Sequence, residues 1–250
     1  AAKIQASLLP TEAPASSTMR FAWDFRPCAF IGGDTFGVFK IDEQNIGLYV
    51  LDVSGHGVPA AMFAVFLSRI MTPRSEERTH GREMTILRGI SALAPDHVAA
   101  ALNERFQMDE TTNQYFTMIY GVLNTRSLVF SYVNAGHPPP IIVGAHSKAI
   151  VEKSMDPPIG MLTGGGYSTQ EVQLAELDRL FLFTDGLVDA QNQEKEFFRD
   201  RLLAHTMAAK DKSIDDQVNE IMTTLGKWVE PDDLQDDVTL IGVEVLPAQE

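Results

Sequence analysis

The sequence predicts one α+β domain built from antiparallel layers. Segments with strand-like alternation follow one another directly along much of the chain, and the predicted helices fall into two clusters. A doubly wound parallel sheet would instead alternate strand and helix one by one. With 250 residues, 44% of them hydrophobic, the chain can bury a sizeable core, and one large domain is favoured over two small ones.

The first ten residues carry a short amphipathic pattern. Ile4 and Leu8 lie four residues apart, which places them on one face of a helix over residues 3–9, and Pro10 ends that helix. We interpret residues 1–10 as the end of a linker helix from a missing upstream domain. A fraying terminal helix is the alternative, and pairing of such helices would allow a homodimer.

The next predicted elements are three strands and a helix. Phe21, Trp23 and Phe25 alternate with smaller or polar residues, as expected for a half-buried strand. The strands cover 20–26, 36–41 and 46–53, and the helix runs from 59 to 71 with proline in its first turn. The polar, arginine-rich stretch 72–88 follows. It could grip an acidic phosphoprotein, or it could be an ordinary solvated segment.

The remaining elements complete the two-cluster pattern. Ser213 and Asp216 form a capping box, and apolar residues from Ile214 onward recur at helical spacing. We expect helices at 95–107, 197–207 and 213–229, a hairpin of 114–123 with 128–133, and strands at 140–143, 149–153, 168–172, 177–184 and 238–245.

Composition excludes several classes of protein. The net charge is −14, and residues 171–250 alone carry 7 basic and 19 acidic side chains, so a nucleic-acid partner is disfavoured. The single cysteine, Cys28, rules out a disulfide scaffold. Apolar runs are far shorter than the ~20 residues of a membrane span, and no signal peptide is recognisable. We therefore expect a cytoplasmic protein with no membrane partner.

Four short segments share an aspartate at the end of a strand, beside glycine or another aspartate. A single Asp-Gly pair usually marks only a turn, but strand ends that converge would bring several carboxylates together. Such oxygen ligands suit Mg²⁺ or Mn²⁺, and the absence of a Cys/His cluster makes zinc unsuitable. Two bridged cations could activate a water for phosphoester hydrolysis. The segments are Gly32-Gly33-Asp34, Asp52–Gly57, Thr184-Asp185-Gly186 and Asp236–Thr239.

Six ordered motifs then carry a family resemblance. They are IGGDTFGVF, YVLDVSGHGVPAAM, YVNAGHPPPIIV, DPPIGM, LFLFTDGLVDAQN and DDVTLIGVEV. Together they resemble the SpoIIE/RsbU-type protein phosphatases, the bacterial branch of the metal-dependent type 2C (PPM) family. The resemblance implies a four-layer αββα sandwich of two antiparallel sheets flanked by helices over residues 11–250, as the output domain of a response regulator.

The resemblance also implies roles for individual residues. Asp52 matches the carboxylate that bridges two metals, and Val53 the position that gives a backbone carbonyl to one of them. Asp185 and Asp236 match the other direct ligands. Asp34 matches the aspartate of the GGD motif, which is either a ligand or an acid that supports the ligands. The implied cofactors are two or more Mn²⁺ or Mg²⁺ ions.

Three further residues have weaker assignments. Asp237, next to the last ligand, is expected to support the site. His56 is a candidate general acid, with a turn or surface role as the alternative. His137 in the NAGH motif is expected to be structural, holding a turn before three prolines.

The implied reaction is hydrolysis of phosphoserine or phosphothreonine by a water that the two metals activate. The implied substrate is a phosphorylated STAS-type anti-anti-sigma factor, under control of an upstream receiver or sensor domain. A non-catalytic adaptor of the same fold, binding a sigma factor or its regulator, is the alternative. A cysteine phosphatase is excluded because Asp34, not arginine, stands six residues after Cys28. A diguanylate cyclase is disfavoured because Thr35 follows the GGD.

Overall fold

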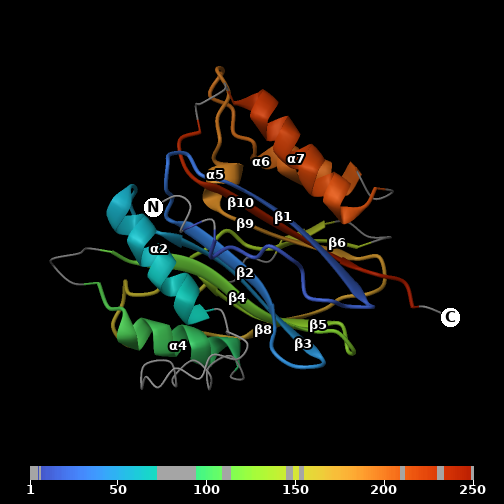
Figure 1. The fold of residues 1–250 in the computed structure, drawn as a ribbon, viewed down its shortest axis with the longest axis horizontal. Coiled ribbons are helices and arrows are strands. Elements are labelled where there is room, and N and C mark those ends of the chain that lie inside the picture. The colour runs from blue at the N-terminus through green and yellow to red at the C-terminus, as the bar shows by residue number, and fades with distance from the viewer. Residues whose placement is uncertain are drawn as a thin grey trace.

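The strands form two five-stranded antiparallel sheets in a computed structural model (Figure 1). The structure describes residues 5, 7–71, 94–108, 114–144, 149–151, 155–208, 212–229 and 234–248. One sheet has the order β2-β3-β4-β5-β8, and the other has the order β1-β10-β9-β6-β7. The last strand of the chain, β10, therefore lies between β1 and β9.

The strand bounds follow the alternation seen in the sequence. The first sheet contains β2 (Asp34–Lys40), β3 (Asn45–Val53), β4 (Phe116–Asn124), β5 (Val129–Ala135) and β8 (Gln170–Gln173). The second sheet contains β1 (Met19–Arg26), β10 (Val238–Val245), β9 (Arg179–Phe183), β6 (Ile141–Val143) and β7 (Ala149–Val151).

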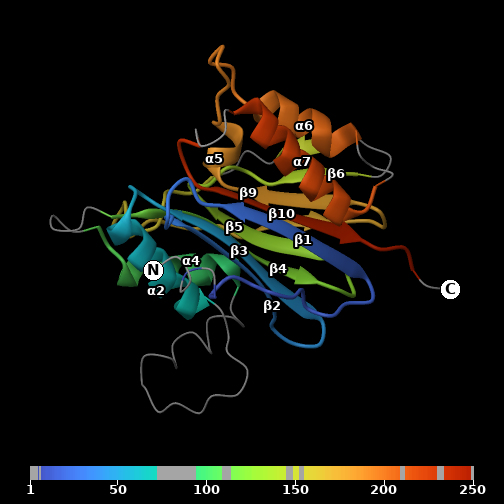
Figure 2. The same cartoon turned by 45° about the horizontal axis from the view of Figure 1, so that its top comes forward.

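Helices cover the outer face of each sheet, which gives four layers (Figure 2). Two helices, α2 (Val58–Met71) and α4 (Pro95–Arg105), pack on the first sheet. Three more, α5 (Asp185–Val188), α6 (Arg199–Ala208) and α7 (Ile214–Trp228), lie against the second. The sequence prediction of a four-layer αββα sandwich is confirmed.

The main core lies between the two sheets. Phe36 and Leu48 of the first sheet meet Leu182 and Ile241 of the second, and all four side chains are fully buried. Because helices cover the opposite faces, both sides of the central strands are buried, and β3 and β10 are nearly continuous apolar runs. Because both faces of each sheet are packed, the ends of the strands are held rigidly and can position side chains.

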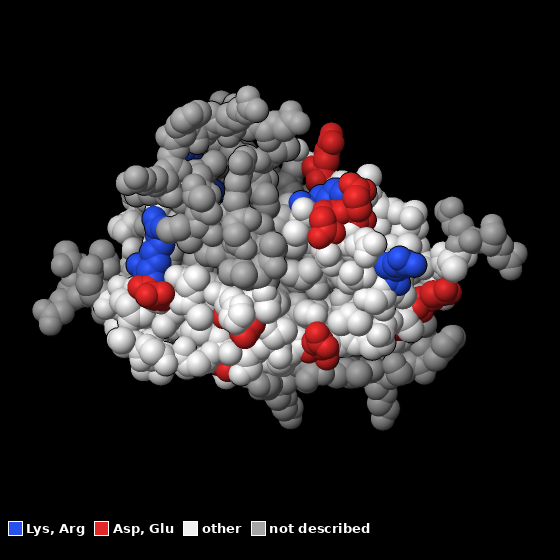
Figure 3. Space-filling model, turned by 90° about the horizontal axis from the view of Figure 1, so that it is seen from below, with Lys and Arg blue, Asp and Glu red and all other residues white. Residues whose placement is uncertain are grey.

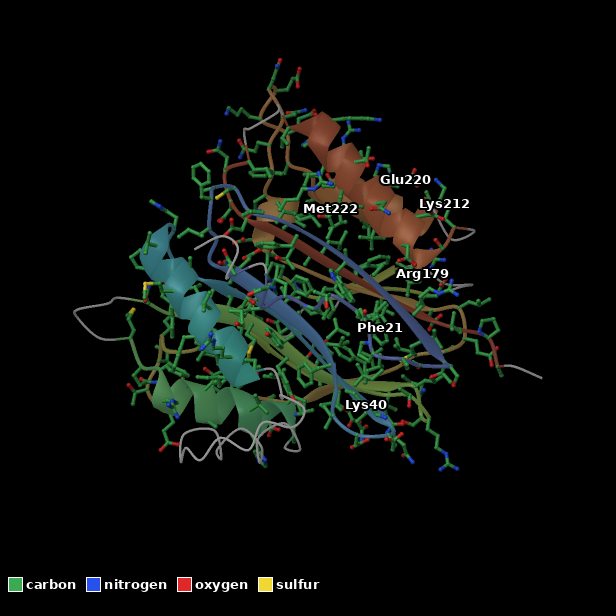
Figure 4. The ribbon with its side chains drawn as sticks, viewed as in Figure 1. Phe21, Lys40, Arg179, Lys212, Glu220 and Met222 are labelled. Atoms are coloured by element: carbon green, nitrogen blue, oxygen red, sulfur yellow. The ribbon has the colours of Figure 1, made fainter. Side chains whose placement is uncertain are left out.

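A buried ion pair stabilises the second sheet at the start of α7 (Figure 4). Arg179 on β9 donates to Glu244 of β10 and to Gln217 of α7, both at 2.6 Å, and also to the carbonyl of Lys212. Ser213 caps the same helix by accepting from the Asp216 N–H, as the capping box predicted. Exposed charges on the face in Figure 3 are instead scattered among uncharged side chains. One exposed ion pair joins Lys40 and Glu43 at 2.7 Å.

Most predicted elements agree with the structure within a few residues. One element was not predicted: α5 is a four-residue helix that begins at Asp185 itself, directly after β9. Of the predicted helix over residues 3–9, Gln5 is helical, whereas residues 7–9 form a turn and a bend, so the predicted helix ends too late. Residues 3, 4 and 6 lie outside the described part, as does the arginine-rich stretch 72–88. The division at residue 10 stays a prediction. No described helix is long and apolar enough to cross a membrane.

Candidate metal centre

The predicted ligands come together at one end of the two sheets. Asp34, the first residue of β2, lies directly opposite Asp52 near the end of β3. Asp185 follows the last residues of β9, and Asp236 immediately precedes β10, the strand paired with β9. Two carboxylates therefore come from each sheet, and their charges act on one another.

Asp34 is the most deeply buried of the four, with only 1% of its surface exposed. Its Oδ2 accepts hydrogen bonds from the hydroxyls of Thr184 at 2.7 Å and Thr239 at 2.8 Å, both on the other sheet. Burial raises the pKa of Asp34, and the Asp52 charge adds to this, while the two hydroxyls act in the opposite direction. These hydroxyls join the sheets through Asp34 and orient its carboxylate.

The other three carboxylates crowd one another in a partly solvated space. Burial, together with the charges of Asp185 and Asp236, raises the pKa of Asp52 to about 8. The pKa of Asp185 is also raised, first by burial and then by the Asp236 charge. Burial raises the pKa of Asp236, whereas nearby His56 partly lowers it. Such shifts are expected where several carboxylates share a site that is partly shielded from water.

The neighbouring Asp237 binds backbone N–H groups. Its carboxylate accepts the backbone N–H groups of Gly33 at 2.6 Å, Cys28 at 2.9 Å and, more weakly, Asp34 at 3.4 Å. These contacts fix the loop that leads into β2 and thus the start of the strand that carries Asp34. The expectation that Asp237 supports the site stays a prediction, and this geometry is what favours it.

Glycine is required where the loop into β2 passes β3. A Cβ atom on Gly33 would lie 2.9 Å from the backbone oxygen of Val53, closer than real Cβ atoms approach a backbone oxygen. The missing side chain therefore lets the loop pass close to the Val53 carbonyl. This carbonyl is the backbone oxygen that the family resemblance assigns as a ligand.

The two histidines of the motifs occupy different surroundings. His56 is exposed in the turn between β3 and α2, near Asp236. His137 is buried; its N–H donates to Asn134, and its Nδ1 lies 2.8 Å from the Thr117 hydroxyl. Burial lowers the pKa of His137 to about 3, which keeps the ring neutral. The structural role expected for His137 agrees with this environment.

Sequence reasoning missed the polar residues that hold the carboxylates in place. Thr184 and Thr239 could have been suspected, because they stand one and two residues from a motif aspartate, at the end of β9 and the start of β10. Gln5 gave no such signal. Its side chain is buried, donates to the Gly32 carbonyl at 2.7 Å and accepts the Gly32 N–H at 3.1 Å.

The residues at this site fit a hard divalent cation. The donors are carboxylate and carbonyl oxygens, the ligands that Mg²⁺ and Mn²⁺ prefer. Burial and the neighbouring carboxylate charges raise the pKa values of Asp52 and Asp185, and a divalent cation would offset this repulsion. A second grouping, Cys28 with Asp236 and Asp237, adds a sulfur within reach of the same carboxylates. However, burial raises the pKa of the Cys28 thiol to about 11, which disfavours its thiolate as a ligand.

Two antiparallel five-stranded sheets, helices on both outer faces and aspartates at a shared end define a PP2C-type phosphatase domain. The solved SiaA-PP2C domain of Pseudomonas aeruginosa has the same fold, with a TM-score of 0.76, 18% identity and coverage of 97% of this chain and 93% of that one. The chain also matches the family described as Stage II sporulation protein E (SpoIIE) over residues 42–246. It therefore belongs to the SpoIIE family.

Two curated relatives extend this comparison. The phosphoserine phosphatase RsbP of Bacillus subtilis is 29% identical over 246 residues, which are 98% of this chain and 57% of RsbP. The phosphoserine phosphatase RsbU of the same organism is 24% identical over 242 residues, covering 96% of this chain and 68% of RsbU. The chain thus spans only part of each relative.

Proposed function

We propose that the chain is a metal-dependent phosphatase that hydrolyses phosphoserine or phosphothreonine in a protein. The observation that carries this proposal is the meeting of Asp34, Asp52, Asp185 and Asp236 at one end of the paired sheets, with their pKa values raised by burial and mutual repulsion. Carboxylates that must stay ionised in such a space need cations, and the fold and family are those of phosphatases.

Each residue has a defined part in this proposal. Asp52 would hold the cations together with its neighbours, since it lies opposite Asp34 and the charges of Asp185 and Asp236 act on it. Asp185 and Asp236 complete the ligands from the second sheet, and the Val53 carbonyl adds a backbone donor. Two or more Mn²⁺ or Mg²⁺ ions held there would lower the pKa of a water and offset charge on the phosphoryl oxygens.

The leaving serine or threonine oxygen requires a proton. His56 is the candidate donor, since it is exposed at the mouth of the site and interacts with Asp236. An imidazole has a pKa suited to giving up a proton near neutral pH. A structural role of His56 in its glycine-flanked turn is the competing explanation.

The proposed substrate is a phosphorylated STAS-type anti-anti-sigma factor, acted on in the cytoplasm. Support comes from the relatives RsbP and RsbU, both named phosphoserine phosphatases. Because the chain covers only part of those proteins, we further propose that an upstream receiver or sensor domain regulates it through residues 1–10. The linker helix would also provide the means of forming a homodimer.

The test is turnover of p-nitrophenyl phosphate and of a phosphoserine peptide with Mn²⁺, with Mg²⁺ and with chelator. Asp185→Asn should reduce Mn²⁺-dependent turnover to the chelator background while the protein stays folded. Asp215→Asn, which changes an exposed aspartate of α7, is the matched control and should retain activity. Absence of both turnover and metal binding in the wild-type protein would refute the proposal and favour the non-catalytic adaptor.

A further inference from the structure

The loop between β1 and β2, residues 27–33, ends beside the carboxylates and exposes an apolar tip. Phe30 is 93% exposed, which is the highest value among the large hydrophobic side chains in the described part of the chain. Pro27 and Ala29 are exposed beside it. The loop lies at the same end of the sheets as α5, the helix that begins with Asp185 (Figures 1 and 2).

This loop is held in place from two sides, so the exposure of Phe30 does not come from a frayed segment. Asp237 accepts the N–H groups of Cys28 and Gly33, one on each side of Phe30. Gln5 makes two hydrogen bonds with the backbone of Gly32. An aromatic side chain on a fixed loop loses little conformational freedom on binding, which favours its use as an anchor.

The usual size of a protein–protein interface indicates that a protein bound at the carboxylates also covers Phe30. Phe30 stands four positions before Asp34, so their Cα atoms are at most about 14 Å apart. A specific protein partner covers about 800 Å² of one surface, which corresponds to a disc of about 16 Å radius. A protein that presents a phosphorylated side chain to the carboxylates therefore reaches Phe30. Aromatic residues are enriched at such interfaces.

We propose that Phe30 is a docking anchor for the phosphoprotein substrate and binds an apolar side chain close to the phosphorylated residue. The inference rests on the proposed phosphatase function and adds the chemical character of its substrate. The metal centre would recognise the phosphoryl group, and Phe30 would select an apolar neighbour of that group. A substrate without such a neighbour would lose this contact.

The experiment compares two phosphoserine peptides that differ only near the phosphoserine, one with leucines on both sides and one with serines. Wild-type protein with Mn²⁺ should prefer the leucine peptide by about tenfold in kcat/KM, the scale expected for burying one large apolar side chain. Phe30→Ala should remove this preference. It should also lower the ratio of leucine-peptide turnover to p-nitrophenyl phosphate turnover by a similar factor. Phe197→Ala, an exposed phenylalanine before α6, is the matched control and should keep the preference.

Binding provides a readout that does not depend on catalysis. Fluorescence anisotropy of the labelled leucine peptide, measured with Mn²⁺, should show weaker binding to Phe30→Ala than to wild type or Phe197→Ala. If that difference is found without turnover, docking by Phe30 stands and the phosphatase proposal fails. Equal binding and equal peptide preference in wild type and Phe30→Ala would overturn the anchor. A shift in oligomeric state of Phe30→Ala with unchanged peptide binding would also overturn it, by assigning Phe30 to a contact between copies of the chain.

Discussion

Replacing Asp52 by asparagine should stabilise the metal-free protein. Burial of Asp52, together with the charges of Asp185 and Asp236, raises its pKa from 3.8 to about 8. A raised carboxylate pKa means that the folded protein binds a proton which the unfolded chain does not bind. The stability contributed by the protonated form is therefore complete below about pH 4 and is lost as the pH rises toward about 8.

The magnitude follows from the size of the shift. Each pH unit in this window costs about 1.4 kcal/mol of unfolding free energy. At pH 7 the cost is on the order of 4 kcal/mol if Asp52 alone takes up the proton. Asparagine has nearly the same shape and carries no charge. The substitution should therefore raise stability at pH 7 in chelator by a few kcal/mol.

The assay is urea denaturation in chelator from pH 5 to 8, repeated with Mn²⁺. Wild type should lose stability as pH rises in chelator and regain about 2.7 kcal/mol when Mn²⁺ reaches about 100 times its dissociation constant. Asp52→Asn should show a shallower pH slope and little response to Mn²⁺. Glu176→Gln, an exposed acid outside the cluster, should behave like wild type. An Asp52→Asn protein that is less stable than wild type in chelator at pH 7, with an unchanged slope, would refute the reasoning.

Three further substitutions test the surroundings of the site. Asp237→Ala should lower the unfolding free energy by about 3 kcal/mol or more, because backbone N–H groups of the loop into β2 lose their acceptor. Asp237→Asn should lower it less. Equal stability of wild type and both variants in urea denaturation would contradict the role of Asp237 in fixing the loop. Gly33→Ala should weaken Mn²⁺ binding, measured by calorimetry, at least about tenfold, because the new Cβ atom would displace the Val53 carbonyl. Gly166→Ala, which has open space around it, should leave Mn²⁺ binding unchanged. The lowered pKa of His137 makes the wild-type protein lose about 1.4 kcal/mol of unfolding free energy per pH unit as the pH falls from about 6.5. His137→Gln should remove this loss. A wild-type slope in the variant would show that the buried ring is not the source of the loss.

The fold was predictable because the strands carry clear alternation or continuous apolar runs. The start of β2 was less clear: Asp34 and Thr35 are polar residues in a buried strand, so the pattern alone placed the strand two residues too late. They are tolerated there because the Asp34 carboxylate faces hydroxyls of the other sheet. The short helix α5 had no periodic pattern to reveal it, since it is only one turn long.

The candidate site was predictable as a set of aspartates but not as an arrangement. The role of Asp237 depends on backbone groups about two hundred positions earlier in the chain, and no local pattern encodes that contact. Gln5 is similar, since its partner is the backbone of Gly32. Backbone groups are the same at every residue, so only the fold shows which side chains bind them.

The central position of β10 has a consequence for synthesis on the ribosome. This strand separates β1 from β9, and among the described strands β10 is the one with which β1 pairs. Asp236 emerges about 200 residues after Asp34, a delay of about 10 to 40 seconds at ordinary translation rates. Until then β1 has no strand to pair with, and the carboxylate cluster lacks a member. The nascent chain thus cannot bring the four carboxylates together before nearly all of the domain has been translated, so a product truncated before β10 would lack the complete cluster.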